Sequence, residues 1–309
     1  MHIQFLGTSA GRPTKSRNVT SAAFVHSEPA SGFWLFDAGE GTQQQMFGTK
    51  LKLNKLEKIF VTHLHGDHIY GLPGLLSSRS YFDGAGPLVM YGPPGLRAFI
   101  DGVFMHSGTY LEYELTVTEI GPGVIMDDGH YRVTADELVH RLPSFGYRIE
   151  ESAQSGQLDL EQLARRGVEP GPAYGKLKRG EDIILPSGEL VRSAEVVGPP
   201  VPGRIVTILG DTCPCENGIA LARNADLLVH EATFESGMEE KATAYGHSTV
   251  RQAAQIAADA GAKQLALTHF SSRYDDEAIT ELIAEGQKLF PNIVAAYDYM
   301  ELPVPRQSS

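Results

Sequence analysis

The segment Thr62–His68 constrains this chain more than any other, because four potential metal ligands, His63, His65, Asp67 and His68, fall within six residues. The run directly before it, Lys-Ile-Phe-Val-Thr, is β-branched and aromatic, which predicts a buried strand. Side chains that directly follow a strand are held rigidly in the fold. The pattern therefore predicts a metal-binding cluster at the end of a buried strand.

The spacing within this cluster suggests two ions. His63 and His65 are two residues apart, so they point the same way if the extended backbone continues that far. Gly66 permits a turn, after which Asp67 and His68 aim at a second point nearby. An imidazole pair and a carboxylate–imidazole pair suit two divalent ions such as zinc. A set of surface histidines without a metal is the alternative, and it fits poorly with four ligands at one strand end.

Composition places the chain among soluble globular proteins. Its 309 residues, 42% hydrophobic and 21% charged, can bury a large core in one domain or two. The first seven residues read as a strand and not as a signal peptide. No stretch approaches the roughly 20 apolar residues of a membrane span. The two cysteines, Cys213 and Cys215, are too close for an ordinary disulfide framework. We therefore expect a cytoplasmic protein without a membrane partner.

The net charge of −12 argues at first against a nucleic-acid partner. Two bound divalent ions would reverse the local charge where a phosphate must lie. The cations are also clustered. The loop Gly11–Asn18 carries Arg12, Lys15 and Arg17, which either grip phosphate or form an ordinary solvated loop. Residues 165–180 hold one acid against five cations, namely Arg165, Arg166, Lys176, Lys178 and Arg179.

The rest of the chain alternates strands and helices. Strands are expected at 2–8, 33–37, 58–62, 88–91, 115–119, 131–138, 204–209, 225–229, 264–268 and 293–297. Helices are expected up to 47 and at 71–80, 96–105, 248–260 and 276–289, the fourth of them capped by Ser248. This order on both sides of residue 152 suggests two facing sheets with helices outside.

Residues 152–193 differ from the alternating parts. They are rich in Gly, Pro and charge and lack long apolar runs, which indicates an inserted arm that packs little against the core. A surface insertion without function is the alternative. We accordingly expect a single domain over 1–309 with the arm inserted at 152–193.

Further candidate ligands follow the other strands. His140, Asp211 and His269 each come directly after a strand, although a lone His140 could equally be structural. Together with the motif His63–His68, they resemble the metallo-β-lactamase superfamily, whose fold is an αβ/βα sandwich with metals at one edge. The loop Pro13–Asn18, the motifs His230-Glu231-Ala232-Thr233 and Gly246-His247-Ser248-Thr249, and the arm make the chain more specifically similar to the ribonuclease Z family in its short form.

The resemblance implies a site and a reaction. Two Zn²⁺ ions per subunit, with Mn²⁺ or Co²⁺ as possible substitutes, would be held in two groups. His63, His65 and His140 would form one, and Asp67, His68 and His269 the other, with Asp211 bridging. The reaction would be hydrolytic removal of the 3′ trailer from precursor tRNA, leaving a 3′-OH and a 5′-phosphate. Three residues would assist catalysis: Asp67 orients water, and His247, held by Glu231, protonates the leaving oxygen.

The resemblance also implies RNA contacts. Lys15 and Arg17 would sense the tRNA 3′ end, and the arm cations Lys176, Lys178 and Arg179 would bind the tRNA elbow. Arg273 is a further phosphate contact or an ordinary surface arginine. A homodimer would let one subunit's arm serve the other's active site. The alternatives are another hydrolase of this fold, acting on thioesters, lactones or sulfate esters, and a non-catalytic RNA-binding scaffold.

Overall fold

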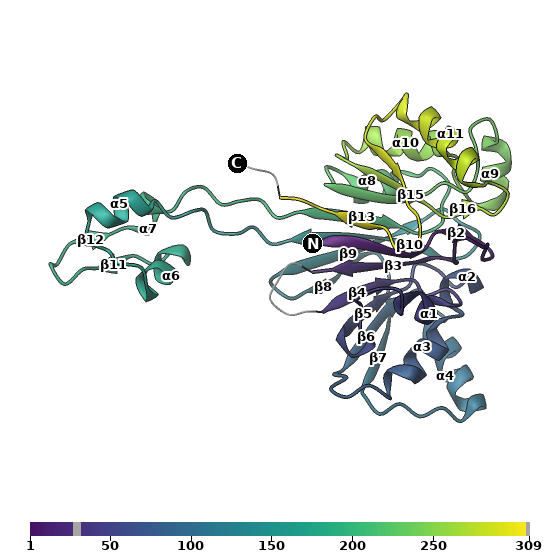
Figure 1. The fold of residues 1–309 in the computed structure, drawn as a ribbon, viewed down its shortest axis with the longest axis horizontal. Helices are drawn as coiled ribbons and strands as arrows, with labels where there is room; N and C mark the ends of the chain where they lie inside the picture. The colour runs from purple at the N-terminus through teal and green to yellow at the C-terminus, as the bar shows by residue number, and fades with distance from the viewer. Residues whose placement is uncertain (27–31, 307–309) are drawn as a thin grey trace.

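Two seven-stranded sheets form the centre of the protein, which a computed structural model describes for residues 1–26 and 32–306 (Figure 1). The first sheet has the order β18 (Glu301–Pro303), β1 (His2–Gly7), β3 (Ser21–Val25), β4 (Phe33–Phe36), β5 (Leu56–Phe60), β6 (Leu88–Gly92) and β7 (Leu115–Glu119). The second has the order β17 (Ile293–Ala295), β15 (Leu265–Thr268), β14 (Leu227–Glu231), β13 (Ile205–Leu209), β10 (Ser144–Glu151), β9 (Tyr131–Leu138) and β8 (Gly123–Asp127).

Helices cover the outer face of each sheet (Figure 1). On the first sheet they are α1 (Thr42–Met46), α2 (Gly66–Ile69), α3 (Leu72–Arg79) and α4 (Leu96–Ser107), with a 3₁₀ turn at Leu53–Lys55. On the second they are α8 (Glu216–Ala222), α10 (Val250–Asp259) and α11 (Asp276–Gln287), while α9 (Glu239–Tyr245) lies at the sheet edge. The four-layer sandwich expected from the sequence is therefore confirmed.

The burial pattern of β4 explains why the layers stack. Side chains alternate along a strand, so Trp34 and Phe36 point into the core between the sheets. Phe33 and Leu35 point the other way, into the core under the first-sheet helices. All four are at most 2% exposed. A strand buried on both faces reads as an unbroken apolar run, and this is the signal that predicted it.

Most predicted elements match the structure, with differences at their ends. The strand predicted at 225–229 is β14 and continues through His230 and Glu231. Helix α10 is capped by Thr249 and not by Ser248: the Thr249 side chain accepts from the Gln252 amide in a capping box. The Ser248 hydroxyl instead donates to the Thr212 carbonyl in the interior. In the two large sheets, strands β3, β8, β10 and β18 were not predicted.

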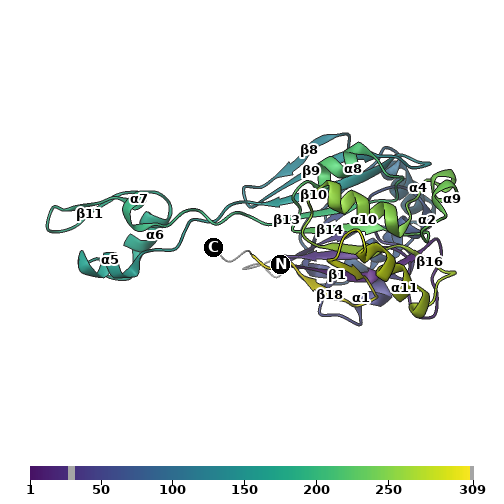
Figure 2. The ribbon, with the colours of Figure 1, turned by 90° about the horizontal axis from the view of Figure 1, so that it is seen from above.

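The arm projects from one end of the second sheet (Figures 1 and 2). It leaves after β10 and returns before β13, and the bridges Gln154–Val201 and Leu158–Val197 hold its two stems together. Its outer part contains α5 (Leu160–Arg165), α6 (Pro172–Lys178), α7 (Ser193–Val196) and the hairpin of β11 (Ile183–Ile184) and β12 (Leu190–Val191). A small separate core fills it, consisting of Leu163, Val168, Leu177, Val191 and Val196.

Candidate active site

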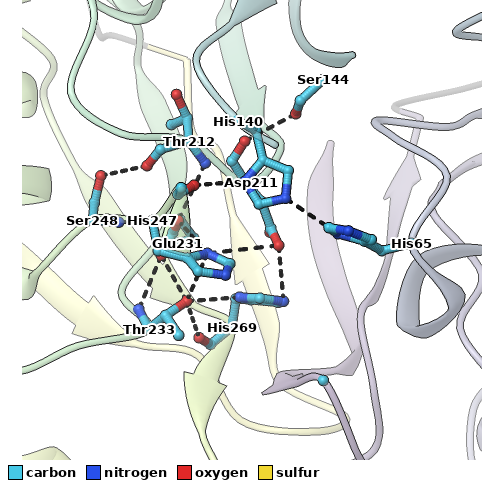
Figure 3. Close-up of polar contacts among 12 residues, drawn as sticks. His65, His140, Ser144, Asp211, Thr212, Glu231, Thr233, His247, Ser248 and His269 are labelled. Atoms are coloured by element: carbon cyan, nitrogen blue, oxygen red, sulfur yellow. Dashed lines mark hydrogen bonds and ion pairs between the residues drawn. The ribbon is translucent and has the colours of Figure 1, made fainter. Parts of the chain in front are cut away.

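Seven potential ligands from four segments converge at one edge of the sheets. Figure 3 shows four of them, His65, His140, Asp211 and His269. Each follows or lies just beyond a strand: the segment after β5 carries four, and one each follows β9, β13 and β15. Because β13, β14 and β15 run parallel, their carboxyl ends meet at this edge. The ligands form two groups, His63, His65, His140 with Asp211, and Asp67, His68 with His269.

In the first group, three ring nitrogens converge. The Nδ1 atom of His65 lies 2.9 Å from His63 Nε2 and 3.1 Å from His140 Nε2. His140 Nδ1 lies 2.6 Å from the Gly246 carbonyl oxygen, which only accepts, so this nitrogen carries the proton and Nε2 presents a lone pair. Burial lowers the pKa of His63 and of His140, which favours the neutral rings.

In the second group, hydrogen bonds fix the rings in the same way. His68 Nδ1 lies 2.8 Å from the Asp37 carboxylate, so its Nε2 faces the site. The Thr233 hydroxyl donates to Glu231 Oε2 at 2.7 Å and therefore accepts from His269 Nδ1 at 2.9 Å. The Nε2 atoms of His68 and His269 then approach to 3.3 Å. Burial acts to lower the pKa of His68, but the Asp211 and Asp37 carboxylates outweigh it and raise that pKa well above its ordinary value. The site therefore favours a positive charge between the two rings, either a proton or a metal ion.

Asp211 connects the two groups. Its Oδ2 atom lies 3.7 Å from His63 Nε2, 3.6 Å from His68 Nε2 and 3.4 Å from His269 Nε2. The side chain is 4% exposed, and a carboxylate this buried needs positive partners. Imidazole nitrogens arranged around shared carboxylates are the donor set that zinc and similar borderline ions prefer. The residues present therefore fit two divalent ions, with Asp211 between them.

Asp37 is a supporting residue that the sequence reasoning missed. Its two oxygens accept from the Thr62 amide at 2.7 Å and the Thr62 hydroxyl at 2.8 Å, besides binding His68. The backbone of Asp37 is left-handed, with φ 56°, as is that of His269, with φ 57°. Such strain costs roughly 1–3 kcal/mol at each non-glycine residue and concentrates at functional sites. In the sequence, the one indication of this role is that Asp37 ends the strand predicted at 33–37.

His247 and Glu231 form a buried pair beside the ligands. His247 Nδ1 lies 2.9 Å from Glu231 Oε1 and 3.7 Å from Asp211 Oδ2. Burial acts to lower the pKa of His247, but the Glu231 carboxylate outweighs it and raises that pKa to about 9. Glu231 also accepts from the amides of Thr212 and Ser248. The carboxylate is therefore fixed, and it holds the imidazole at the side of the ligand cluster.

An open cleft of roughly 390 Å³ leads from the surface to this cluster. Its floor contains His65, Asp67, Asp211, His247 and His269. Its walls contain Ala10, Gly11, Thr233, Phe234, Lys241, Tyr245, Ser271 and Arg273. The sequence predicted functional roles for the floor residues and for Arg273. It did not predict them for Phe234, Lys241 or Tyr245, which lie on a loop and a short helix without a distinctive motif.

The basic loop Gly11–Asn18 borders the cleft, and its cations differ in how far they are buried. The Gly11 amide donates to Asp67 Oδ2 at 2.7 Å, which ties the loop to the site. Lys15 is exposed. Arg17 is 8% exposed, and its guanidinium donates to Thr8, the Ala296 carbonyl and Asp276. These donors are used inside the protein, where they anchor the loop, and a contact of Arg17 with RNA stays a prediction.

The arm cations also differ from the expectation of a uniformly basic surface. Arg165 pairs with Glu161, Arg166 with Glu195, and Arg179 with Glu181 at 2.7 Å. All three acids lie outside residues 165–180, the segment that holds five cations and one acid. Within the described part of the chain, Lys176 and Lys178 form no ion pair. They are consequently the cations most available to a phosphate.

Proteins of known identity resemble this chain over its whole length. Ribonuclease Z of Bacillus licheniformis is 50% identical over 306 residues, which cover 99% of this chain and 100% of that protein. The chain belongs to the ribonuclease Z family. Ribonuclease BN of Enterobacter sp. is 47% identical, covering 98% of this chain and all of that one.

Solved structures and a family model add to this assignment. The crystal structure of human tRNase Z, short form, is 31% identical, covers 99% of this chain and 100% of its own, and superposes with a TM-score of 0.72. The metallo-β-lactamase fold protein YhfI of Bacillus subtilis, 19% identical over 98% of this chain and 99% of its own, has a TM-score of 0.68 and shows the fold alone. A model for the anti-Pycsar protein Apyc1 matches residues 1–100. The ribonuclease Z family thus shares both fold and sequence with the chain.

Proposed function

We propose that this ribonuclease Z family member is an endoribonuclease that removes the 3′ trailer from precursor tRNA. The observation that carries the proposal is the convergence of seven potential ligands beside the His247–Glu231 pair. Four of these ligands and His247 line one open cleft. The names of its relatives in bacteria and human point to the same substrate. Such a substrate places the protein in the cytoplasm. No helix in residues 1–26 and 32–306 is long and apolar enough to cross a membrane.

The ligand groups would hold two Zn²⁺ ions. His63, His65 and His140 would bind one, and Asp67, His68 and His269 the other, with Asp211 shared. Mn²⁺ or Co²⁺ would also suit these donors. When bound, such ions supply a lowered pKa for water and positive charge for the phosphoryl oxygens.

The protein's own groups would then guide the reaction. The Asp67 carboxylate accepts a hydrogen bond from the attacking water and orients it toward phosphorus. The O–P bond to the tRNA 3′ oxygen breaks, and His247 gives that oxygen a proton, a transfer that typically contributes 10²–10⁴-fold. Glu231 holds the His247 ring in place throughout. Because water attacks, the products are a tRNA 3′-OH and a trailer 5′-phosphate.

RNA recognition would come from exposed cations near the cleft and on the arm. Arg273 lines the cleft, and Lys15 is exposed on the loop whose Gly11 also lines it, so both can meet phosphates of a bound RNA. On the arm, Lys176 and Lys178 would contact the tRNA elbow, with Arg179 contributing if it releases Glu181. Folded tRNA is recognised largely through its shape and backbone, so a distant contact of this kind adds affinity without touching the reacting bond.

The position of the arm favours a homodimer. β10 and β13 carry the arm at one end and lead to His140 and Asp211 at the other. Eight strand residues separate the ends by roughly 25 Å, so an arm cannot reach its own cleft and would serve that of a second subunit. Large apolar side chains are exposed directly after α1, directly after α2 and on α4, and they offer a contact surface: Phe47, Tyr70 and Met105.

Complementation tests this arrangement. An arm-deleted protein is mixed with full-length Asp211→Ala protein, each weakly active or inactive alone. If arms act in trans, mixed dimers should regain cleavage of precursor tRNA. Activity no greater than the sum of the separate proteins, or a monomer in sedimentation equilibrium, would contradict it.

End-mapping of cleavage products tests the proposed function itself. A 3′-extended tRNA is incubated with the protein, with and without a chelator, and both new ends are identified. We expect one cut at the start of the trailer, a 3′-OH on the tRNA and no cut after chelation. Intact precursor, or hydrolysis only of a thioester or lactone offered in parallel, would refute the proposal.

A further inference from the structure

One wall of the cleft, formed by α9 and the loop after β14, combines aromatic rings with cations. Tyr245 is 48% exposed at the cleft, two residues before His247. The Arg141 guanidinium lies over its ring, 4.8 Å from the centroid. Arg141 Nη2 donates to the Ala244 carbonyl at 2.9 Å, which fixes the guanidinium in that position. The result is a prearranged planar pair beside the candidate proton donor.

The rest of this wall supports the pair and adds charge. Phe234 is 3% exposed and packs behind Tyr245, with 6.2 Å between the ring centroids. Arg273 lies over Phe234 at 5.0 Å. Lys241 precedes Tyr245 by one helical turn, so both project from the same face of α9, and both line the cleft. Stacked planes alternating with cations are the chemistry that holds single-stranded nucleic acid, since bases stack and phosphates meet Lys and Arg.

We propose that Tyr245 and Arg141 form a stacking subsite for the nucleobase immediately 5′ of the scissile phosphate. The inference rests on the proposed function, which makes His247 the donor to the departing 3′ oxygen. That oxygen belongs to the 5′-side nucleotide, so its base lies next to His247 and therefore along this wall. Lys241 would meet the backbone of the same strand. Stacking is tolerant of sequence, which suits an enzyme that must accept different tRNAs.

Paired changes in protein and substrate test the subsite. Precursor tRNAs are prepared intact, with an abasic nucleotide 5′ of the scissile phosphate, or with one 3′ of it. Each is cleaved by the full-length protein and by Tyr245→Ala, Tyr245→Phe and Arg141→Ala. Tyr81→Ala, at a side chain 88% exposed elsewhere, is the matched control.

With intact precursor, Tyr245→Ala should lower kcat/KM by about 5- to 100-fold, the range typical of one stacked base. Tyr245→Phe should stay within a few-fold of the parent, because the ring is kept. The 5′ abasic substrate should lower kcat/KM of the parent by a similar factor. For Tyr245→Ala, kcat/KM should be nearly the same with the 5′ abasic and the intact substrate. With the substrate that lacks the 3′ base, the loss of kcat/KM should instead be the same for Tyr245→Ala as for the parent, so the two losses multiply.

Additive penalties with the 5′ abasic substrate, or coupling only to the 3′ nucleotide, would overturn the subsite while leaving cleavage intact. Failure of the parent to cleave any precursor would instead overturn the proposed function. Thermal unfolding and metal content are measured for each variant. If Tyr245→Ala does not fold, the same coupling test on Arg141→Ala decides the matter.

Discussion

The two ends of the strand pair β10–β13 are built differently. At one end, His140 and Asp211 enter a network of buried side chains from five segments, with φ strain at Asp37 and His269. At the other, the buried Arg204–Glu151 pair closes the base of an arm with its own small core. The first end is held by contacts among segments that are distant in the sequence, whereas the outer part of the arm is held by a core from its own residues. This contrast suggests that chemistry resides at one end and remote binding at the other.

The largest effect that sharpens this contrast is expected from Asp211→Ala. Removing the shared carboxylate takes a ligand from both groups, so hydrolysis of precursor tRNA and of bis(p-nitrophenyl) phosphate should both fall by about 10³-fold or more, several kcal/mol of lost stabilisation. Steady-state kinetics with metal analysis measures it. A variant that keeps both ions and most of its activity would show that Asp211 is not central.

His247→Ala is expected to rank next. Loss of the proton donor should lower kcat by about 10²–10⁴-fold, while the seven ligands keep their metal. The control is His106→Ala, at an exposed position in the last turn of α4. Turnover is compared with metal content from plasma mass spectrometry. If both fall in equal measure, His247 supports the metal and does not donate a proton.

A smaller effect is expected at Asp37, which contacts the Nδ1 atom of His68 and not the Nε2 atom that faces the site. Asp37→Asn keeps a side chain that tolerates the left-handed backbone but weakens the orientation of His68. Loss of such a supporting carboxylate typically costs 10–100-fold in metal affinity. Competition with a chelating dye provides the measurement, with exposed Asp101→Asn as control. Unchanged affinity would show that the His68 ring needs no fixing.

The smallest effect is expected on the arm. The double change Lys176→Ala and Lys178→Ala should raise KM for precursor tRNA a few-fold and flatten its salt dependence, as lost phosphate contacts do. Arg165→Ala, whose side chain is already paired with Glu161, is the matched control. Equal effects from both variants would mean that ion pairing does not decide which arm cations bind.

Most of the strands, and the residues that converge as candidate ligands, could be predicted from the sequence for a physical reason. Strands buried on both faces read as apolar runs, and a candidate ligand such as His63 or His269 is the polar residue at which the run stops. The candidate ligands far from the motif His63–His68, namely His140, Asp211 and His269, also follow strands. The family resemblance was needed only to assign them to two groups.

The features that were missed depend on contacts between distant segments. In the sequence, Arg17 resembles the nearby Lys15. In the structure, its guanidinium donates to Asp276 and the Ala296 carbonyl, over 250 residues away. Asp37 gains its role only through Thr62 and His68. The stacking of Arg141 on Tyr245 likewise joins the loop after β9 to the end of α9, about a hundred residues further along the chain. Local patterns locate ligands, but they do not show which polar groups are already satisfied.

Removing the arm tests the division between the two ends most directly. Residues 155–200 are replaced by a short Gly-Ser link between Gln154 and Val201, which already form a bridge. We predict a large rise in KM for precursor tRNA, with bis(p-nitrophenyl) phosphate hydrolysis and the melting temperature nearly unchanged. Equal loss of both activities would contradict the account, because the arm would then be part of the structure that holds the catalytic edge.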